Sequence, residues 1–134
     1  MDRTAMKTML ANAKTIAVVG LSDKPDRASY GVAQYLQRAG YKIIPVNPQL
    51  KGPVLGEQPF ASLRDITEPI DIVDIFRRAE DVPPVVADAI AVGAKAVWLQ
   101  LGIVNAEAAA AAEAAGLEVV QDKCLKVEHA RLGL

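Results

Sequence analysis

The sequence predicts an α/β fold: a doubly wound, mainly parallel sheet of about five strands with helices on both faces. Short apolar runs alternate with segments of helical periodicity along nearly the whole chain. Connections that contain a helix join parallel strands and place helices on both faces of the sheet. The 134 residues fit one domain, residues 1–134, which is large enough to bury one hydrophobic core.

The first strand is expected at Thr15–Val19, a continuous apolar run of the kind that is buried on both faces. Residues 30–39 follow with apolar side chains at helical spacing, and Gly40 suits the position after a helix end. The second strand is expected at Lys42–Val46. Because proline cannot donate a backbone hydrogen bond, Pro45 predicts that this strand lies at a sheet edge or ends there.

The middle of the chain predicts a long loop and a third strand with its helix. Residues 47–65 contain three prolines and two glycines and are expected to be mostly loop, with a short helical turn at Ser62–Asp65. Asp71–Ile75 is expected to be the third strand. Two prolines open the next helix, which is expected over residues 83–92.

The last third of the chain repeats the alternation. Lys95–Leu99 is expected to be the fourth strand and Glu118–Gln121 the fifth. Between them, residues 105–115 are nearly all alanine, which has the highest helix propensity, and Asn105 is a suitable N-cap. A final helical turn is expected within residues 126–132.

Composition excludes several functional classes. Fifteen basic and sixteen acidic residues give a net charge of -1, which argues against a generic nucleic-acid binder. One cysteine and one histidine exclude a disulfide framework, a cysteine-only zinc site and a histidine-rich metal site. No apolar stretch reaches the length of a membrane span, and the first residues lack the apolar core of a signal peptide. We therefore expect a cytoplasmic protein without a metal site.

In an open parallel sheet, ligands bind beyond the carboxyl ends of the strands, so the loops there supply the candidate residues. The loop after the first strand offers a glycine for close backbone approach, hydroxyls, basic side chains and the start of a helix, which favours phosphate. Its candidates are Gly20, Leu21, Ser22, Lys24, Arg27, Ser29 and Tyr30. The alternative is that Gly20 is only a turn residue and Ser29 only an N-cap.

The motifs of nucleotide-binding enzymes are absent from this loop. The dinucleotide fingerprint would need glycines where Ser22 and Pro25 stand, and the Walker lysine pattern is missing. The acidic residue that anchors the ribose of NAD at the end of the second strand is also missing, because Val46, Asn47 and Pro48 occupy that place. The absence of the glycine fingerprint and the absence of the acidic residue both argue against an NAD-dependent dehydrogenase.

The loop after the third strand begins with Phe76, Arg77 and Arg78. Adjacent guanidinium groups suit phosphate, although a solvated surface pair is an equal alternative. Phe76 could stack on an adenine, and Lys51, after the second strand, has a weaker claim to the ligand. No catalytic residue is predicted, because His129 lies away from every strand end and a lone cysteine such as Cys124 is more often a small buried side chain than a nucleophile.

The sequence resembles a known family of small stand-alone CoA-binding proteins. These are similar to the amino-terminal, Rossmann-like CoA-binding domain of the succinyl-CoA synthetase alpha subunit and of ADP-forming acyl-CoA synthetases. The resemblance covers about residues 13–132. The segments that carry it are VVGLSDKPDRASYGVAQYL, GYKIIPVNP, SLRDI, DIVDIFRR, VWLQLG and AAGLEVVQDKC.

The resemblance implies that coenzyme A lies across the strand ends. It assigns contacts to the loop after the first strand, to a basic residue near Lys51 and to the loop after the fourth strand. Further residues typical of the stand-alone family would line the site. The implied contacts are Gly20, Leu21, Ser22, Lys51, Gln100, Leu101 and Gly102, with Asn47, Pro48, Phe76 and Arg77 beside them. The synthetases carry a phosphorylated histidine on a second domain, which this chain does not contain, so their acyl-phosphate chemistry is not implied.

The favoured hypothesis is a non-catalytic binding or regulatory protein for CoA or acyl-CoA. The alternatives are the CoA-binding half of a split acyl-CoA synthetase and a small NAD(P)-dependent reductase. A protein partner or self-association remains open. The net charge and the lack of a long apolar stretch predict neither a nucleic acid nor a membrane as a partner.

Overall fold

The computed structural model describes residues 1–134 and contains a single five-stranded sheet in which every pairing is parallel. The strand order is β2-β1-β3-β4-β5, so β2 lies on one side of the first strand and β3, β4 and β5 follow on the other. The doubly wound α/β prediction is therefore confirmed. The strands are β1 (Thr15–Val19), β2 (Lys42–Val46), β3 (Ile72–Ile75), β4 (Ala96–Leu99) and β5 (Glu118–Val120).

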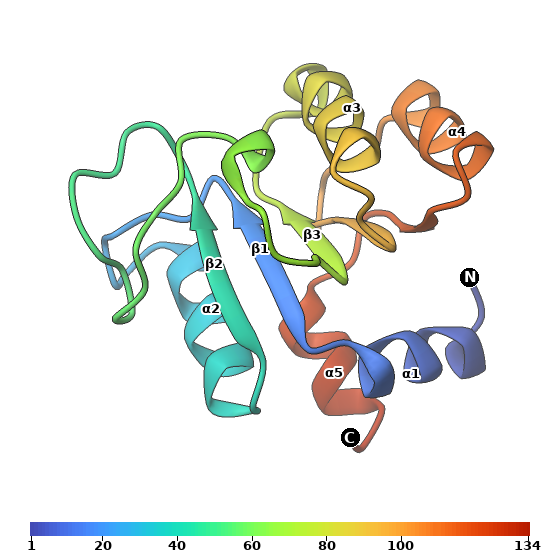
Figure 1. Ribbon diagram of the computed structural model, residues 1–134. Helices are drawn as coiled ribbons and strands as arrows, with labels where there is room; N and C mark the ends of the chain where they lie inside the picture. The colour runs from blue at the N-terminus through green and yellow to red at the C-terminus, as the bar shows by residue number, and fades with distance from the viewer.

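Five α-helices and two short 3₁₀ turns complete the fold (Figure 1). They are α1 (Arg3–Asn12), α2 (Ala28–Arg38), η1 (Leu63–Asp65), η2 (Ala79–Asp81), α3 (Val82–Ala91), α4 (Ala106–Ala114) and α5 (Leu125–Arg131). The helices expected between the strands are all present. None of the helices combines the length and apolarity needed to cross a membrane.

Helix α1 was not predicted from the sequence. Asp2 caps it by accepting a hydrogen bond from the backbone N–H of Ala5 at 2.7 Å. Its apolar side chains Met6, Met9 and Leu10 are buried against the sheet layer. The segment forms a helix because this apolar stripe finds a surface to cover, which only the folded chain provides.

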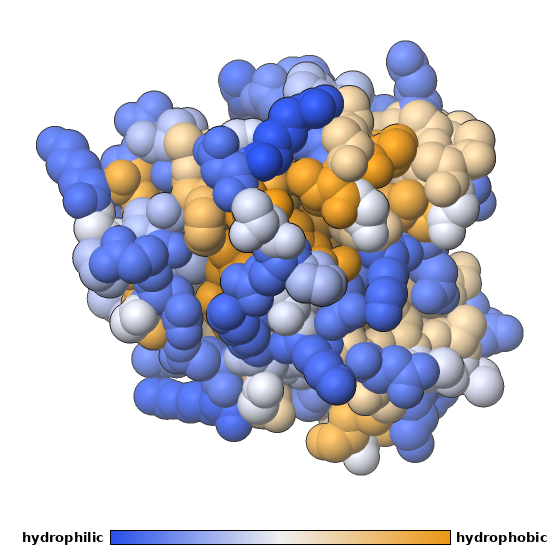
Figure 2. Space-filling view, viewed as in Figure 1, coloured by the Kyte–Doolittle hydropathy of each residue, from blue (hydrophilic) through white to orange (hydrophobic).

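The pleat of the strands divides the core into two layers (Figure 1). One layer packs alternate strand residues against α3 and α4, and the other packs the remaining strand residues against α1, α2 and α5. Helices α1 and α5 lie side by side, where Arg3 donates a hydrogen bond to the carbonyl of Arg131 at 3.0 Å. Figure 2 shows apolar residues in the middle of one face of the molecule, surrounded by hydrophilic side chains.

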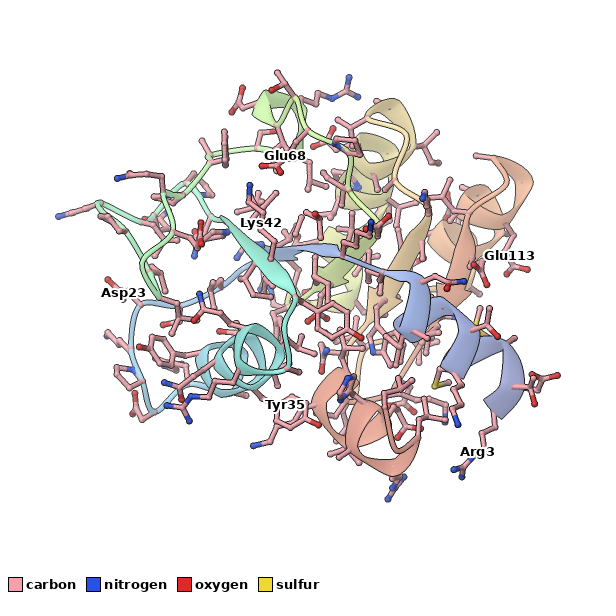
Figure 3. The ribbon with its side chains drawn as sticks, turned by 60° about the horizontal axis from the view of Figure 1, so that its bottom comes forward. Arg3, Asp23, Tyr35, Lys42, Glu68 and Glu113 are labelled. Atoms are coloured by element: carbon pink, nitrogen blue, oxygen red, sulfur yellow. The ribbon has the colours of Figure 1, made fainter.

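Strand β2 is an edge strand, as Pro45 predicted. The Pro45 carbonyl still accepts a hydrogen bond, from the N–H of Phe60 at 2.9 Å, and Asn47 N–H donates to the Phe60 carbonyl at 2.9 Å. The long loop thus folds back along the carboxyl end of β2. At the opposite end of this strand, Lys42 and Glu68 form an ion pair of 2.8 Å (Figure 3).

Because all strands are parallel, their carboxyl ends form one edge of the sheet. Backbone hydrogen bonds continue from the strands into the first residues of the loops: Gly20 donates to Val46, and Phe76 to Val19. Gln100 donates to Ile75 in the same way. The loops that the sequence selected as candidate ligand contacts therefore start side by side.

Candidate functional site

A hollow of about 330 Å³ lies where the loop between β1 and α2 meets the end of β3. We call it the strand-end hollow. It is lined by Gly20, Ser22, Lys24, Arg27, Ala28, Ser29 and Phe76. A larger hollow of about 450 Å³ lies beside β5, but its lining includes the carboxylates of Glu113 and Glu118, which disfavour an anion. The strand-end hollow is the better candidate site.

Gly20 brings two loops into direct contact at the base of this hollow. Its φ angle is +86°, in the region that favours glycine. A Cβ atom at this position would lie 2.2 Å from the carbonyl oxygen of Phe76 and 3.2 Å from Nη1 of Arg77. Glycine is therefore required both for the turn and for the close approach, so the turn-only interpretation of Gly20 is incomplete.

The two serines of the loop use their hydroxyl groups to hold its shape. The Ser29 hydroxyl accepts a hydrogen bond from Ser22 N–H at 3.0 Å, and the Ser22 hydroxyl accepts one from Lys24 N–H at 3.1 Å. The alternative interpretation of Ser29 as only an N-cap is wrong, because α2 begins at Ala28 and Arg27 stands at the N-cap. Ser29 lies inside the first turn and ties it to the preceding loop.

The N-terminus of α2 opens directly on the hollow. Arg27 makes no side-chain hydrogen bond to the first turn, and Ala28 and Ser29 both line the hollow. The uncapped N–H groups and the helix dipole make this end attractive to an anion. Lys24 and Arg27 are exposed beside it and add positive charge.

At the end of β2, both polar groups of the Asn47 side chain are hydrogen-bonded to the backbone of neighbouring loops. Its Nδ2 donates to the Leu21 carbonyl at 3.0 Å, and its Oδ1 accepts from Gln49 N–H at 3.0 Å. The side chain of Leu21 is fully buried in the core, so only its backbone is available to a ligand. Pro48 and Lys51 are exposed in the following loop and do not line the hollow.

The two arginines after β3 have different surroundings. Arg78 is exposed and its Nε lies 3.1 Å from Asp81 Oδ2 and 3.4 Å from Glu80 Oε1. Arg77 is half-buried, makes no ion pair and approaches Gly20. The surface-pair interpretation thus fits Arg78. Arg77 does not line the strand-end hollow, but it has no carboxylate partner and lies next to Gly20.

The end of β4 presents a mostly uncharged loop. The Leu101 side chain is exposed, and Gly102, at a φ angle of +85°, donates its N–H to Asp122 Oδ1 at 2.7 Å. Gln100 is buried, and its Nε2 donates to Oδ1 of Asp74 at 2.6 Å. The candidate Gln100 therefore does not line the strand-end hollow, and its side-chain amide is bonded to the buried carboxyl of Asp74. Tyr30, in the first turn of α2, is half-buried and packs against the core beneath the loop.

Asp74 is the residue of this region that the sequence analysis missed. Its side chain is fully buried in β3, and Oδ2 is the one buried side-chain polar atom in the molecule without a hydrogen-bond partner. Burial raises the pKa of this carboxyl from 3.8 to about 7, against the opposite effect of the Gln100 hydrogen bond. The available signal was an acidic residue inside a run expected to be buried.

Residues with catalytic potential lie elsewhere or are already engaged. His129 is buried between α2 and α5, and its Nδ1 shares a hydrogen bond of 2.8 Å with Tyr35 Oη; the label of Tyr35 in Figure 3 marks this side of the molecule. Burial lowers the pKa of His129. Cys124 is half-buried at the start of α5. No group of three or more His, Cys, Asp and Glu side chains comes together to hold a metal ion.

Comparison with known proteins identifies the family of the sequence. Residues 14–130 match the family described as CoA binding domain. The uncharacterized protein YneT of Bacillus subtilis (strain 168) is 45% identical over 129 residues, which cover 96% of this chain and 95% of that protein.

Solved structures show the same fold. The structure of cell-free ID.343 from Thermus thermophilus superposes with a TM-score of 0.94 and 41% identity, covering 98% of this chain and 99% of that one. The dinucleotide-forming acetyl-coenzyme A synthetase 1 of Ca. Korarchaeum cryptofilum has a TM-score of 0.69 and 22% identity. It covers 80% of this chain, which matches only 25% of the synthetase, and its likeness is one of fold alone.

Proposed function

This chain belongs to the CoA-binding domain family, and from that premise we propose that its strand-end hollow binds coenzyme A or an acyl-CoA in a non-catalytic binding or regulatory role. The observation that carries the proposal is the combination at the base of the hollow. The uncapped N-terminus of α2, the glycine-dependent approach of two loops, and Arg77 meet at one place. The pyrophosphate of CoA is the ligand group that suits them best.

Charge favours CoA over a dinucleotide such as NAD. CoA carries a 3′-phosphate in addition to its pyrophosphate. Lys24 and Arg27 line the hollow, and Arg77 lies next to Gly20 at its base. At the end of β2, where a dinucleotide fold uses a carboxylate to hold ribose, this chain has Asn47, and its amide nitrogen is already bonded to the Leu21 carbonyl. The site thus has cations for an extra phosphate and no ribose anchor.

A binding role without chemistry fits the groups around the hollow. The hydroxyls of Ser22 and Ser29 accept backbone hydrogen bonds, and neither forms a hydrogen bond to a histidine or carboxylate that would activate it. His129 is engaged by Tyr35. We therefore expect no formation of acyl-CoA from an acid, a nucleotide and CoA, and no oxidation of NADH.

Calorimetric titration of CoA, dephospho-CoA and NAD tests the proposal. We expect CoA to bind most tightly and NAD least. Arg77→Ala should weaken CoA binding by about ten- to a hundredfold, the effect of one charged hydrogen bond. Arg78→Ala is the matched control and should have a smaller effect, because Glu80 and Asp81 hold its guanidinium. Equal affinity for CoA and NAD would overturn the proposal, and equal effects of the two variants would overturn the assignment of Arg77.

A further inference from the structure

Asp74 and Gln100 form a buried polar pair directly beneath the strand-end edge. Asp74 lies in the central strand β3, between β1 and β4, with Val18 and Trp98 as its register neighbours. Both members are buried, and Gln100 Nε2 donates to Asp74 Oδ1 at 2.6 Å. An isolated carboxyl in such a layer is costly, because a well-packed apolar side chain could fill the same space without an unpartnered oxygen.

The pair does not line the hollow but lies near two parts of the strand-end edge. Side chains two residues apart on a strand share one face, so Asp74 lies one pleat, about 7 Å, below Phe76. Phe76 lines the hollow, and Gln100 begins the loop between β4 and α4. A charge on Asp74 is therefore felt by a ligand at this edge.

No charged side chain of the neighbouring strands lies beside Asp74. The flanking strands β1 and β4 carry no titratable side chain. Helices α1, α2 and α5 cover this face, and the charged residues of α1, Arg3 and Lys7, are exposed. On α2 and α5, Tyr30, Tyr35 and His129 are half-buried or buried, and Tyr35 and His129 bond to each other. The charged side chains of α2 and α5 are Arg38, Lys126, Glu128 and Arg131, and Glu128 pairs with Arg131. Cys124 lies just before α5. The pKa of Asp74 responds only to burial and to Gln100.

We propose that Asp74 links ligand binding at the strand-end site to pH: binding of an anionic ligand there is accompanied by proton uptake at Asp74 Oδ2. The inference rests on the proposed function, since it takes CoA as the anion. Oδ1 is occupied by the Gln100 amide, so Oδ2 is the atom that receives the proton. The proton comes from solvent, and no covalent bond changes in the ligand.

The direction follows from electrostatics. A nearby anion disfavours the ionised carboxyl and raises its pKa further. Because the pKa without ligand is already about 7, this rise falls in the neutral range. The protonated protein thus binds the anion more tightly, and affinity falls as pH rises. One partly screened charge at this range changes the binding constant by about three- to tenfold.

Calorimetry of CoA binding between pH 6 and pH 8.5 tests the linkage. Titrations in two buffers of different ionisation enthalpy give the number of protons taken up. For the wild type we expect uptake of a fraction of a proton near pH 7.5. From pH 6 to pH 8.5 its affinity should fall about three- to tenfold more than that of Asp74→Asn. The asparagine variant removes the titrating group and nearly keeps the shape, and it should lack this uptake.

Asp71→Asn is the matched control, because Asp71 stands just before the opposite end of β3, where it accepts hydrogen bonds from the N–H groups of Lys14 and Thr15. It should keep the proton uptake of the wild type. Carbon-13 NMR of the wild-type Asp74 carboxyl gives a direct measurement that needs no variant: its pKa should rise when CoA is added.

The outcomes are distinguishable. Equal proton uptake in the wild type and Asp74→Asn, or an unchanged Asp74 pKa on adding CoA, would refute the inference and leave CoA binding standing. Failure of CoA to bind at every pH would remove the proposed function and this inference together.

Discussion

Replacement of Asp74 by asparagine should make the protein more stable at high pH relative to the wild type. The folded-state pKa of about 7 lies above the unfolded value of 3.8, so the folded protein holds a proton that the unfolded chain releases. Stability from this group is complete below pH 3.8 and is lost as pH rises through 7. The difference between these two pKa values corresponds to about 4 kcal/mol of unfolding free energy, of which about 2 kcal/mol is lost between pH 5.5 and pH 8.5.

Urea denaturation of both proteins at pH 5.5, 7 and 8.5 measures this loss. Asp74→Asn cannot titrate, so the difference in unfolding free energy between variant and wild type should shift by about 2 kcal/mol in favour of the variant across this range. The lowered pKa of His129 gives a slope of opposite sign, but it is present in both proteins and cancels in the difference. Parallel stability curves for the two proteins would refute the burial argument for Asp74.

Three further predictions concern Gly20, Ser22 and Tyr35. Gly20→Ala should lower the unfolding free energy in urea denaturation by at least about 2 kcal/mol, because φ is +86° and the new Cβ clashes with the Phe76 carbonyl. Gly31→Ala is the control: it lies inside α2 with open space around it, so the change should be neutral or stabilising by up to about 1 kcal/mol in the same assay. Ser22→Phe should weaken CoA and dephospho-CoA by similar factors in calorimetry, because it fills the hollow; a change for CoA alone would contradict this. Tyr35→Phe should cost about 1–2 kcal/mol in urea denaturation, by leaving His129 Nδ1 without its partner, with CoA affinity unchanged.

The strand pattern could be predicted because β1, β3 and β4 are buried along their whole length and β2 is buried after its first residue. Runs such as Thr15–Val19 and Lys42–Val46 appear in the structure with the same limits, and Pro45 marked its strand as an edge. Helix α1 could not be predicted in the same way. Its apolar residues are few, and its helical state depends on the surface made by the sheet, α2 and α5.

The position of the candidate site could be predicted, but not the engagement of its side chains. Parallel strands bring the loops together wherever they lie in the sequence, so the loop after β1 and Phe76 meet as expected. The difference between Arg77 and Arg78 depends on which guanidinium reaches Glu80 and Asp81. The roles of Ser29 and Leu21 depend on the exact start of α2 and on burial of one loop side chain. Spacing along the chain does not encode these details.

Asp74 is a different case, because its signal was in the sequence. The run Asp71–Ile75 is apolar apart from two acidic residues. Asp71, just before the first residue of β3, accepts hydrogen bonds from the N–H groups of Lys14 and Thr15, and its pKa is lowered. Asp74, inside a strand covered on both faces, has no such partners and must be protonated or bonded by a neighbouring side chain. Gln100, the first residue after the neighbouring strand on the same face, is the donor that a parallel register supplies. An acidic residue at that place is costly to the apo protein, and a site that binds anions near neutral pH gives it a physical use.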